Sequence, residues 1–219
     1  MTNRLSPSPF RATSLDHAEA STWYPIAKRA LDLIVAGTAI VLTAPLMLLI
    51  LIAVRLDSPG PATFSQTRTG KDGRRFRMRK FRTMVQDAEA LKPTLAHLNV
   101  LPPPDFKIPD DPRITRVGRV LRATSLDELP QLFAVLRGDM SLVGPRPTSF
   151  RTEQYQLWHS RRLEVPPGMT GLWQVYGRNR TDFDERLRLD IDYIDRRSVA
   201  LDLWLLLVTV PAVLRREGA

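Results

Sequence analysis

Cysteine is absent from the 219-residue sequence, so disulfide bonds, thiolate nucleophiles and thiolate metal sites are all excluded. Histidine occurs three times, at positions without a partner pattern, and we assign it no catalytic role. Charge is missing from residues 33–54, a run of 22 that would be about 33 Å long as a helix. Because the hydrocarbon core of a bilayer is roughly 30 Å thick, this run is predicted to be a membrane segment.

A proline interrupts the membrane segment near its middle. Pro45 removes a backbone hydrogen bond and pushes Ala44 away from helical geometry, so a kink and a full reversal both fit. Basic residues flank the segment on both sides, with Lys28 and Arg29 before it, and positive charge marks the cytoplasmic side. Both flanks are then expected on the cytoplasmic side of the membrane, which favours a re-entrant helix-break-helix at 25–56. A kinked spanning helix is the alternative, and in either topology the chain that follows is expected to be cytoplasmic.

The net charge of +9 is unevenly distributed. Residues 55–82 hold nine Lys or Arg against two Asp, a local balance of +7. Such a block indicates an anionic partner, which could be nucleic acid, a membrane surface or a phosphorylated substrate. Phe76 and Phe81 are the only aromatic residues between 68 and 82, so a surface that stacks nucleic-acid bases is the weaker choice.

The rest of the chain predicts short elements. Residues 61–84 predict a β-hairpin with its turn at 70–73, whose second strand alternates basic residues with Phe76 and Met78. The acids of a predicted helix at 181–197, Asp190 among them, are expected on a solvated face. Further predictions are a mobile tail at 1–24, a helix at 85–98 with a break at Pro93, an amphipathic helix at 150–163 and an interfacial segment at 203–214.

Two adjacent carboxylates, Asp127 and Glu128, stand in the first turn of a short predicted helix within residues 124–147. The helix dipole favours ionised carboxylates there by roughly 0.3–1 kcal/mol, and they can act as a nucleophile or hold a hard cation. Ser125 followed three residues later by Glu128 is equally a capping box, in which neither acid has a catalytic role. Arg146, fixed between two prolines, suits bidentate phosphate binding.

Two runs in this region resemble the signature of the bacterial sugar transferases, the monotopic phosphoglycosyl transferases. They are Asp-Glu-Leu-Pro-Gln-Leu at 127–132 and Gly-Asp-Met-Ser-Leu-Val-Gly-Pro-Arg-Pro at 138–147. The resemblance covers about 28–215, with similar family elements at 80–84, 111–122 and 167–178.

The resemblance implies a helix-rich α/β, membrane-associated monotopic fold. It combines a re-entrant N-terminal membrane helix broken at Pro45, a small β-hairpin, interfacial amphipathic helices and a cytoplasmic catalytic domain. The expected organisation is a disordered tail at 1–24, the re-entrant helix at 25–56, and the catalytic domain with its interfacial helices at 57–219. The expected location is the bacterial inner membrane, with the catalytic domain on the cytoplasmic face.

The resemblance also implies roles for single residues. Asp127 would be the nucleophile, and Glu128 would hold Mg²⁺ with Asp127 beside it. Tyr176 and Pro166 differ from the residues usual in the family, and these departures bear on sugar preference more than on chemistry. The residues that would bind substrate phosphates are Arg122, Arg146, Arg178 and Lys80.

The implied Mg-dependent reaction moves a phosphosugar from a UDP-sugar to polyprenyl (undecaprenyl) phosphate, through an aspartyl phosphosugar intermediate, and releases UMP. It is the first membrane step of exopolysaccharide, O-antigen or capsule assembly. UDP-sugar, polyprenyl phosphate and membrane lipid are the expected partners, nucleic acid is not one, and a homodimer stays open. One alternative is an enzyme that binds both substrates at once, without a covalent intermediate. Another is a non-catalytic membrane-anchored module that binds anionic lipid or nucleic acid through residues 55–82.

Overall fold

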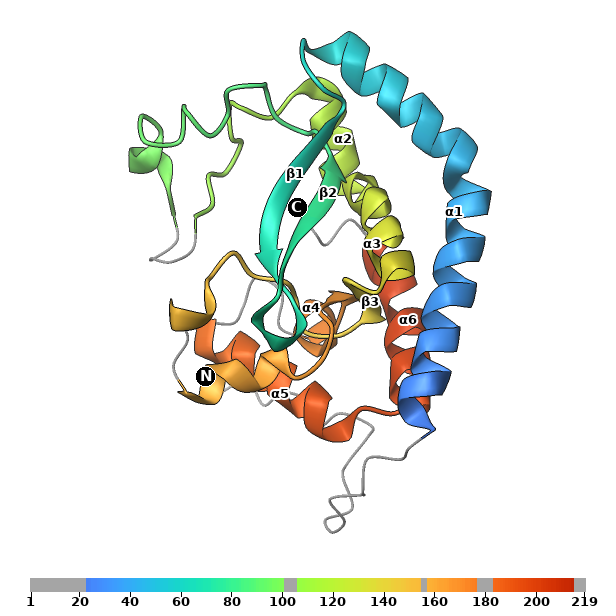
Figure 1. The fold of residues 1–219 in the computed structure, drawn as a ribbon. Helices are drawn as coiled ribbons and strands as arrows, with labels where there is room; N and C mark the ends of the chain where they lie inside the picture. Colours follow the sequence, from blue (N-terminus) through green and yellow to red (C-terminus); the bar gives the residue numbers. More distant parts are fainter. Residues whose placement is uncertain (1–22, 101–105, 155–156, 177–182, 215–219) are drawn as a thin grey trace, which may run out of the picture.

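The structure is a computed structural model that describes residues 23–100, 106–154, 157–176 and 183–214. It is helix-rich and contains two small two-stranded sheets, as expected for the predicted α/β class (Figure 1). The predicted tail at 1–24 lies outside the described residues except for its last two.

Helix α1 (Tyr24–Asp57) is continuous through Pro45. Figure 1 shows that it changes direction along its length, and the missing amide hydrogen of Pro45 is a sufficient cause of a kink. Thr43 donates a hydrogen bond from Oγ1 to the Ala39 carbonyl at 2.7 Å, which supports the backbone just before the proline. The break expected at Ala44 and Pro45 is therefore a bend inside one helix, without a reversal.

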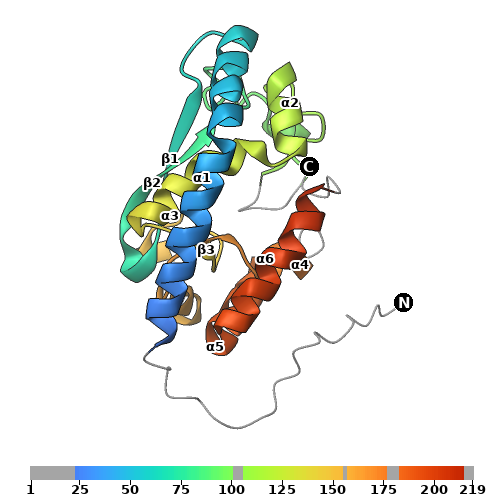
Figure 2. The same ribbon diagram turned by 90° about the vertical axis from the view of Figure 1, so that its right-hand side faces the viewer.

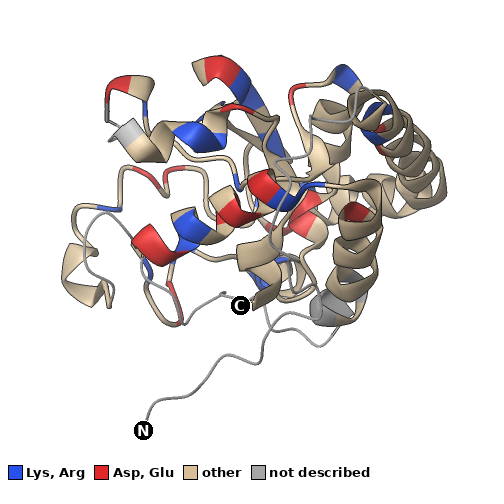
Figure 3. Ribbon diagram, turned by 90° about the horizontal axis from the view of Figure 1, so that it is seen from below, with Lys and Arg blue, Asp and Glu red and all other residues tan. Residues whose placement is uncertain are grey.

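Most of α1 is uncovered. Only 11% of its most apolar 18-residue stretch is buried, and side chains such as Val41 and Leu42 are about three-quarters exposed (73% and 75%). Helix α6 (Val199–Leu214) lies on the same side of the molecule and exposes Leu207 (Figure 2). Viewed from below, both helices carry few charged residues, and charge gathers elsewhere (Figure 3). Exposed apolar side chains on two neighbouring helices are typical of a surface that contacts an apolar partner.

The predicted hairpin is confirmed. Strands β1 (Thr63–Thr69) and β2 (Arg75–Phe81) pair antiparallel around the short 3₁₀ turn η1 (Lys71–Gly73). Phe76 and Met78 are buried, whereas Arg75, Arg77 and Arg79 on either side of them are exposed, so the alternation sorts the two faces as predicted.

The elements that surround the carboxylates are short. Helix α2 (Arg116–Ala123) leads into the 3₁₀ helix η3 (Leu126–Gln131), which continues directly as α3 (Leu132–Arg137). Strand β3 (Ser141–Val143) then pairs in parallel with β4 (Gly168–Thr170), a sheet that the sequence did not predict.

Two predicted helices are wrong. Residues 85–98 form turns that end in the 3₁₀ helix η2 (Ala96–Leu98), and 150–163 forms two 3₁₀ segments, η4 (Thr152–Gln154) and η5 (Leu157–Leu163). In both regions the apolar spacing was read as helical, but local turns and tertiary contacts override it.

The two C-terminal helices are confirmed in type. After the short helix α4 (Leu172–Tyr176), α5 (Phe183–Arg196) lies within the predicted helix at 181–197 and buries Leu187 and Ile194. Helix α6 begins four residues before the predicted segment at 203–214. One expectation fails: Asp190 of α5 is 2% exposed and does not lie on a solvated face.

Gly118 allows α2 to approach the end of the hairpin. A Cβ added at Gly118 would lie 2.1 Å from the Thr83 carbonyl oxygen, which is backbone and cannot move aside alone. We expect Gly118→Ala to destabilise the protein by about 1–3 kcal/mol, measured as a lower thermal unfolding midpoint in detergent. Gly37→Ala is the control, because nothing lies within 4 Å of its added Cβ and alanine favours a helix. Equal effects of the two substitutions would contradict the close approach.

Candidate active site

The two adjacent carboxylates begin η3, directly after a strained residue. Ser125 has φ 55°, in the left-handed region that non-glycine residues rarely adopt, and its side chain makes no capping hydrogen bond. The capping-box interpretation is therefore wrong, because the Glu128 side chain is engaged elsewhere. Strain of this kind costs about 1–3 kcal/mol and is common at functional sites.

Lys80 of β2 reaches both carboxylates. Its Nζ lies 2.5 Å from Glu128 Oε1 and 3.9 Å from Asp127 Oδ2. Lys80 shares the strand register of the buried Phe76 and Met78, so the pleat turns it inward, towards η3. Strand alternation in the sequence thus indicates that Lys80 lies on the face opposite to that of the exposed arginines of β2.

Arg146 approaches Glu128 from the other side. Its Nη2 lies 3.5 Å from Glu128 Oε1, and its side chain is 41% exposed. The guanidinium carbon also lies 5.8 Å from the ring centre of Trp173 in α4, and Arg186 of α5 lies 5.7 Å from the same ring. Trp173 and Arg186 were not predicted as site residues, because only tertiary packing brings them to Arg146.

Arg122 of α2 lies close enough to feel the charge of Asp127, but its side chain binds Thr83 and not the carboxylates. Its Nε donates to Thr83 Oγ1 at 3.0 Å, and burial lowers its pKa, an effect that the nearby charge of Asp127 opposes. Arg178 lies outside the described residues. The structure therefore gathers five of the six residues predicted for catalysis and phosphate binding.

The environment shifts the pKa values of the two carboxyl groups in opposite directions. Burial raises the pKa of Asp127 above its ordinary value, although the charge of Lys80 opposes this shift. Burial also acts to raise the pKa of Glu128, but Lys80 and Arg146 together outweigh it and lower that pKa to about 2. Glu128 is thus a permanent anion, whereas Asp127 is a poorly solvated carboxylate and, when ionised, a stronger nucleophile.

The residues present fit a divalent cation that is shared with a substrate. No group of three or more His, Asp or Glu side chains gathers as a metal site in the described ranges. Mg²⁺ is usually held by one or two carboxylates together with substrate phosphates. Asp127 and Glu128 supply such a pair.

The basic block at 55–82 is not one binding surface. Arg82 is 6% exposed and donates to the Ser58 carbonyl (2.7 Å) and the Pro59 carbonyl, so it caps the end of α1. Lys80 is held by Glu128, and Arg75 donates to the carbonyls of the loop after β3. Three of the nine basic residues therefore serve the fold or the site, whereas others, such as Arg77 and Arg79, are exposed. The alternative of a non-catalytic binding module stays a prediction.

Tyr176, one of the two departures from the family pattern, packs away from the carboxylates. Its ring stacks on Trp204 of α6, with ring centres 5.8 Å apart. Pro166 lies beside Gly144, whose added Cβ would meet the Pro166 carbonyl oxygen at 2.6 Å. Pro166 therefore borders the sheet of β3 and β4, whereas Tyr176 packs against α6.

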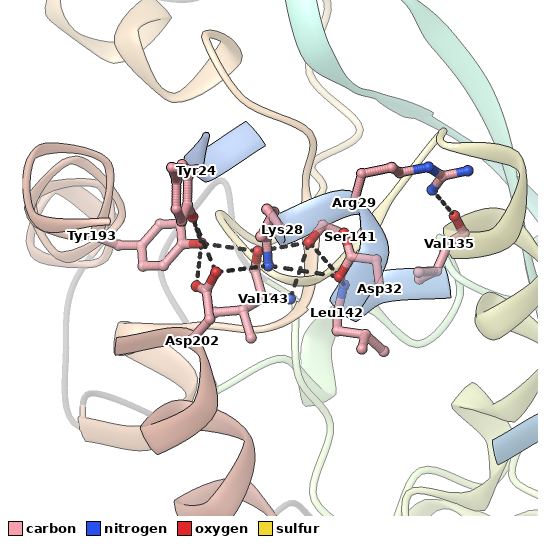
Figure 4. A network of polar contacts seen from close by, with 10 residues as sticks. All are labelled: Tyr24, Lys28, Arg29, Asp32, Val135, Ser141, Leu142, Val143, Tyr193 and Asp202. Carbon is pink, nitrogen blue, oxygen red and sulfur yellow. Dashed lines mark hydrogen bonds and ion pairs between the residues drawn. The ribbon is translucent and has the colours of Figure 1, made fainter. Parts of the chain in front are cut away.

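Helix α1 is joined to β3, the strand that precedes Arg146 in the chain. The Asp32 carboxylate, 4% exposed, accepts hydrogen bonds from the Leu142 amide (3.0 Å) and Ser141 Oγ (3.1 Å) of β3 (Figure 4). Lys28, one turn earlier, lies 3.2 Å from Asp202 Oδ2 of α6 and 3.6 Å from Asp32 Oδ1. A carboxylate at the border of the uncharged run was visible in the sequence, but its partner 110 residues away was not.

Further polar contacts extend this junction (Figure 4). Tyr24 and Tyr193 donate to the two oxygens of Asp202 at 3.0 and 2.7 Å. Arg29 donates to the Val135 and Leu136 carbonyls, both at 2.7 Å, and so caps the end of α3. Lys28 and Arg29, used above as orientation signals, are therefore engaged inside the protein.

The low pKa of Glu128 predicts an acid-sensitive contribution to stability. At pH 7, Glu128→Gln should lower the thermal unfolding midpoint, because Lys80 and Arg146 lose their anionic partner. The folded-state pKa of about 2 lies below the ordinary 4.5, so this contribution is complete above pH 4.5 and fades towards pH 2. The difference from wild type should shrink between pH 7 and about pH 3. The exposed Glu153→Gln is the control, and a constant difference for Glu128→Gln would contradict the assignment.

Comparison with known proteins identifies the family. Residues 23–216 match the family model for bacterial sugar transferases. The chain is 47% identical over 196 residues to the galactosyl transferase CpsE of Streptococcus agalactiae, covering 89% of this chain and 43% of that protein. It is 45% identical over 197 residues to the undecaprenyl-phosphate galactose phosphotransferase of Salmonella typhimurium, covering 88% and 41%.

A third relative is similar over more of its length. The UDP-glucose:undecaprenyl-phosphate glucose-1-phosphate transferase of Caulobacter vibrioides is 44% identical over 201 residues, covering 88% of this chain and 71% of that protein. The chain spans less than half the length of the first two relatives. The match over nearly all of the described residues shows that the chain belongs to the bacterial sugar transferase family.

Proposed function

We propose that this protein transfers a phosphosugar from a UDP-sugar to polyprenyl phosphate and releases UMP. The observation that carries the proposal is the buried Asp127 beside the permanently ionised Glu128, with Lys80 and Arg146 in contact and Arg122 nearby. The names of the Salmonella and Caulobacter relatives, which act on undecaprenyl phosphate, support the same donor and acceptor classes.

Asp127 would form the covalent intermediate. A carboxylate oxygen of Asp127 attacks the β-phosphorus of the donor, and the bond from that phosphorus to the bridging oxygen breaks, so UMP leaves with the electron pair. A phosphate oxygen of the lipid acceptor then attacks the same phosphorus, which releases Asp127 and forms polyprenyl diphosphate sugar. Lys80, Arg122 and Arg146 offset the negative charge of both substrates. Mg²⁺ bound through Glu128 and Asp127 would supply further neutralisation of the phosphate charge.

Helix α1 would place this site at the membrane surface. Its first turns are bound by β3 and α6, and its end is bound by Arg82 and by the Val117 amide, which donates to Asp57 Oδ2 at 3.0 Å. Because both ends of the bent helix are bound by one folded body, α1 can dip into the bilayer at its bend but cannot cross to the other side. This supports a monotopic topology, and the exposed basic residues that follow α1 favour the cytoplasmic face of the inner membrane for the folded body.

Turnover should depend on Asp127. We expect purified protein with Mg²⁺ and polyprenyl phosphate to release UMP from one or a few members of a UDP-sugar panel, which would also identify the sugar. Asp127→Asn should lose this turnover and keep the wild-type unfolding midpoint, because the amide has the same shape but cannot act as the nucleophile. A folded and active Asp127→Asn protein would show that another residue is the nucleophile.

The order of product release separates the two enzyme mechanisms. With the covalent route, about one UMP per active enzyme should appear before any lipid acceptor is added, followed by steady turnover once it is present. Rapid-quench sampling of UMP measures this burst. If both substrates must bind together, UMP appears only after the acceptor, and the aspartyl intermediate is ruled out.

A further inference from the structure

The backbone around Arg146 is fixed mainly through its carbonyl groups. Pro145 and Pro147 have no amide hydrogen, so neither can donate a hydrogen bond that would anchor the loop. The Pro145 carbonyl accepts from the Gly168 amide at 2.8 Å, and the Arg146 carbonyl accepts from Arg162 Nη2 at 2.5 Å. The hydrogen bond from Arg162 is thus one of few contacts that fix the backbone of Arg146, whose side chain reaches Glu128.

Arg162 is itself held by a buried acid. The same Nη2 lies 2.6 Å from Asp190 Oδ2, and the side chains of Arg162 and Asp190 are 6% and 2% exposed. Burial raises the pKa of Asp190 to about 7, although the charge of Arg162 opposes this shift. A buried ion pair is a weak source of stability, because the cost of removing two charges from water offsets their attraction. Its location directly beneath a phosphate-binding loop points to a different role.

We propose that Arg162 and Asp190 are positioning residues that hold the Arg146 backbone so that its guanidinium meets the donor diphosphate. The proposal rests on the proposed function. The Arg146 side chain is long and 41% exposed, so its reach depends on where its backbone is placed. Glu128 and the Trp173 ring orient the guanidinium end, and Arg162 fixes the other end of the same residue.

A double-mutant cycle tests this role. We expect Arg162→Met to reduce kcat/KM for the UDP-sugar by about 10- to 100-fold, since a misplacement of about 1 Å at a reacting centre can cost that much. In an Arg146→Ala background the same substitution should cost less than about threefold, because no guanidinium remains to be positioned. Asp190→Ala, which removes the acceptor of Arg162 Nη2, should behave in the same way as Arg162→Met.

The matched control is Arg113→Met. Arg113 also pairs with a buried aspartate, Asp111, at 2.6 Å, and also donates to a backbone carbonyl, that of Ala88, at 3.0 Å. Both side chains of this pair are 5% exposed, but neither contacts the carboxylates at the site. Its effect on kcat/KM should be the same with and without Arg146.

Stability is measured separately, with activity expressed per folded protein. Arg162→Lys keeps the buried charge and therefore the fold, but its shorter side chain should not bring one nitrogen to both the Arg146 carbonyl and Asp190 Oδ2, so kcat/KM should still fall. Binding of UDP to the Asp127→Asn protein, by calorimetry, gives a second readout that needs no turnover, and Arg162→Lys should weaken it.

The outcomes are distinct. Equal costs of Arg162→Met in the two backgrounds, or wild-type kcat/KM and UDP binding in Arg162→Lys, would reduce the pair to a purely structural element. Absence of UMP release from the wild-type protein with every UDP-sugar would instead overturn the proposed function. In that case the same double-mutant cycle, measured on the affinity for UDP instead of on kcat/KM, still decides whether Arg162 acts through Arg146.

Discussion

The carboxylate of Asp32 joins the apolar helix α1 to strand β3, and the location of the candidate site relative to α1 depends on that junction. Arg29 makes a second link, to the carbonyls that end α3. Asp127 and Glu128 precede α3 in the chain, and Arg146 follows β3. Two side chains less than one helical turn apart on α1 therefore hold both halves of the site.

The site itself is a balance of opposite charges in a partly dry environment. Lys80 and Arg146 converge on Glu128, so cations that could bind phosphate are kept in place before a substrate arrives. Asp127 lies at the edge of this cluster, buried enough to lose hydration but close enough to Lys80 to keep an ionised form accessible. Preorganised charges of this kind need little rearrangement when a charged transition state forms.

Local periodicity predicted the parts of the fold that short-range rules govern. The hairpin and the helix that became α5 follow from alternation or helical spacing. The inward direction of Lys80 was not predicted, although its place in the strand register was visible in the sequence. The spacing at 85–98 and 150–163 was misread, because isolated apolar residues in loops can imitate a helical period. The three-residue strands β3 and β4 are too short to give a signal of their own.

The site was predicted from motif resemblance and only partly from physical pattern. Spacing alone allowed Ser125 and Glu128 to form a cap, and it placed Asp190 in solvent. Both errors concern side chains whose partners lie far away in sequence: Lys80 for Glu128 and Arg162 for Asp190. Such pairings are decided by the packing of whole elements, which residue spacing does not encode.

The depressed pKa of Glu128 also limits what this residue can do during a reaction. A carboxylate with a pKa of about 2 is too weak a base to accept a proton near neutral pH. Glu128 is therefore suited to supply a constant negative charge and not to act as an acid or base. Any proton that moves during turnover must be carried by the substrates, by solvent or by another side chain.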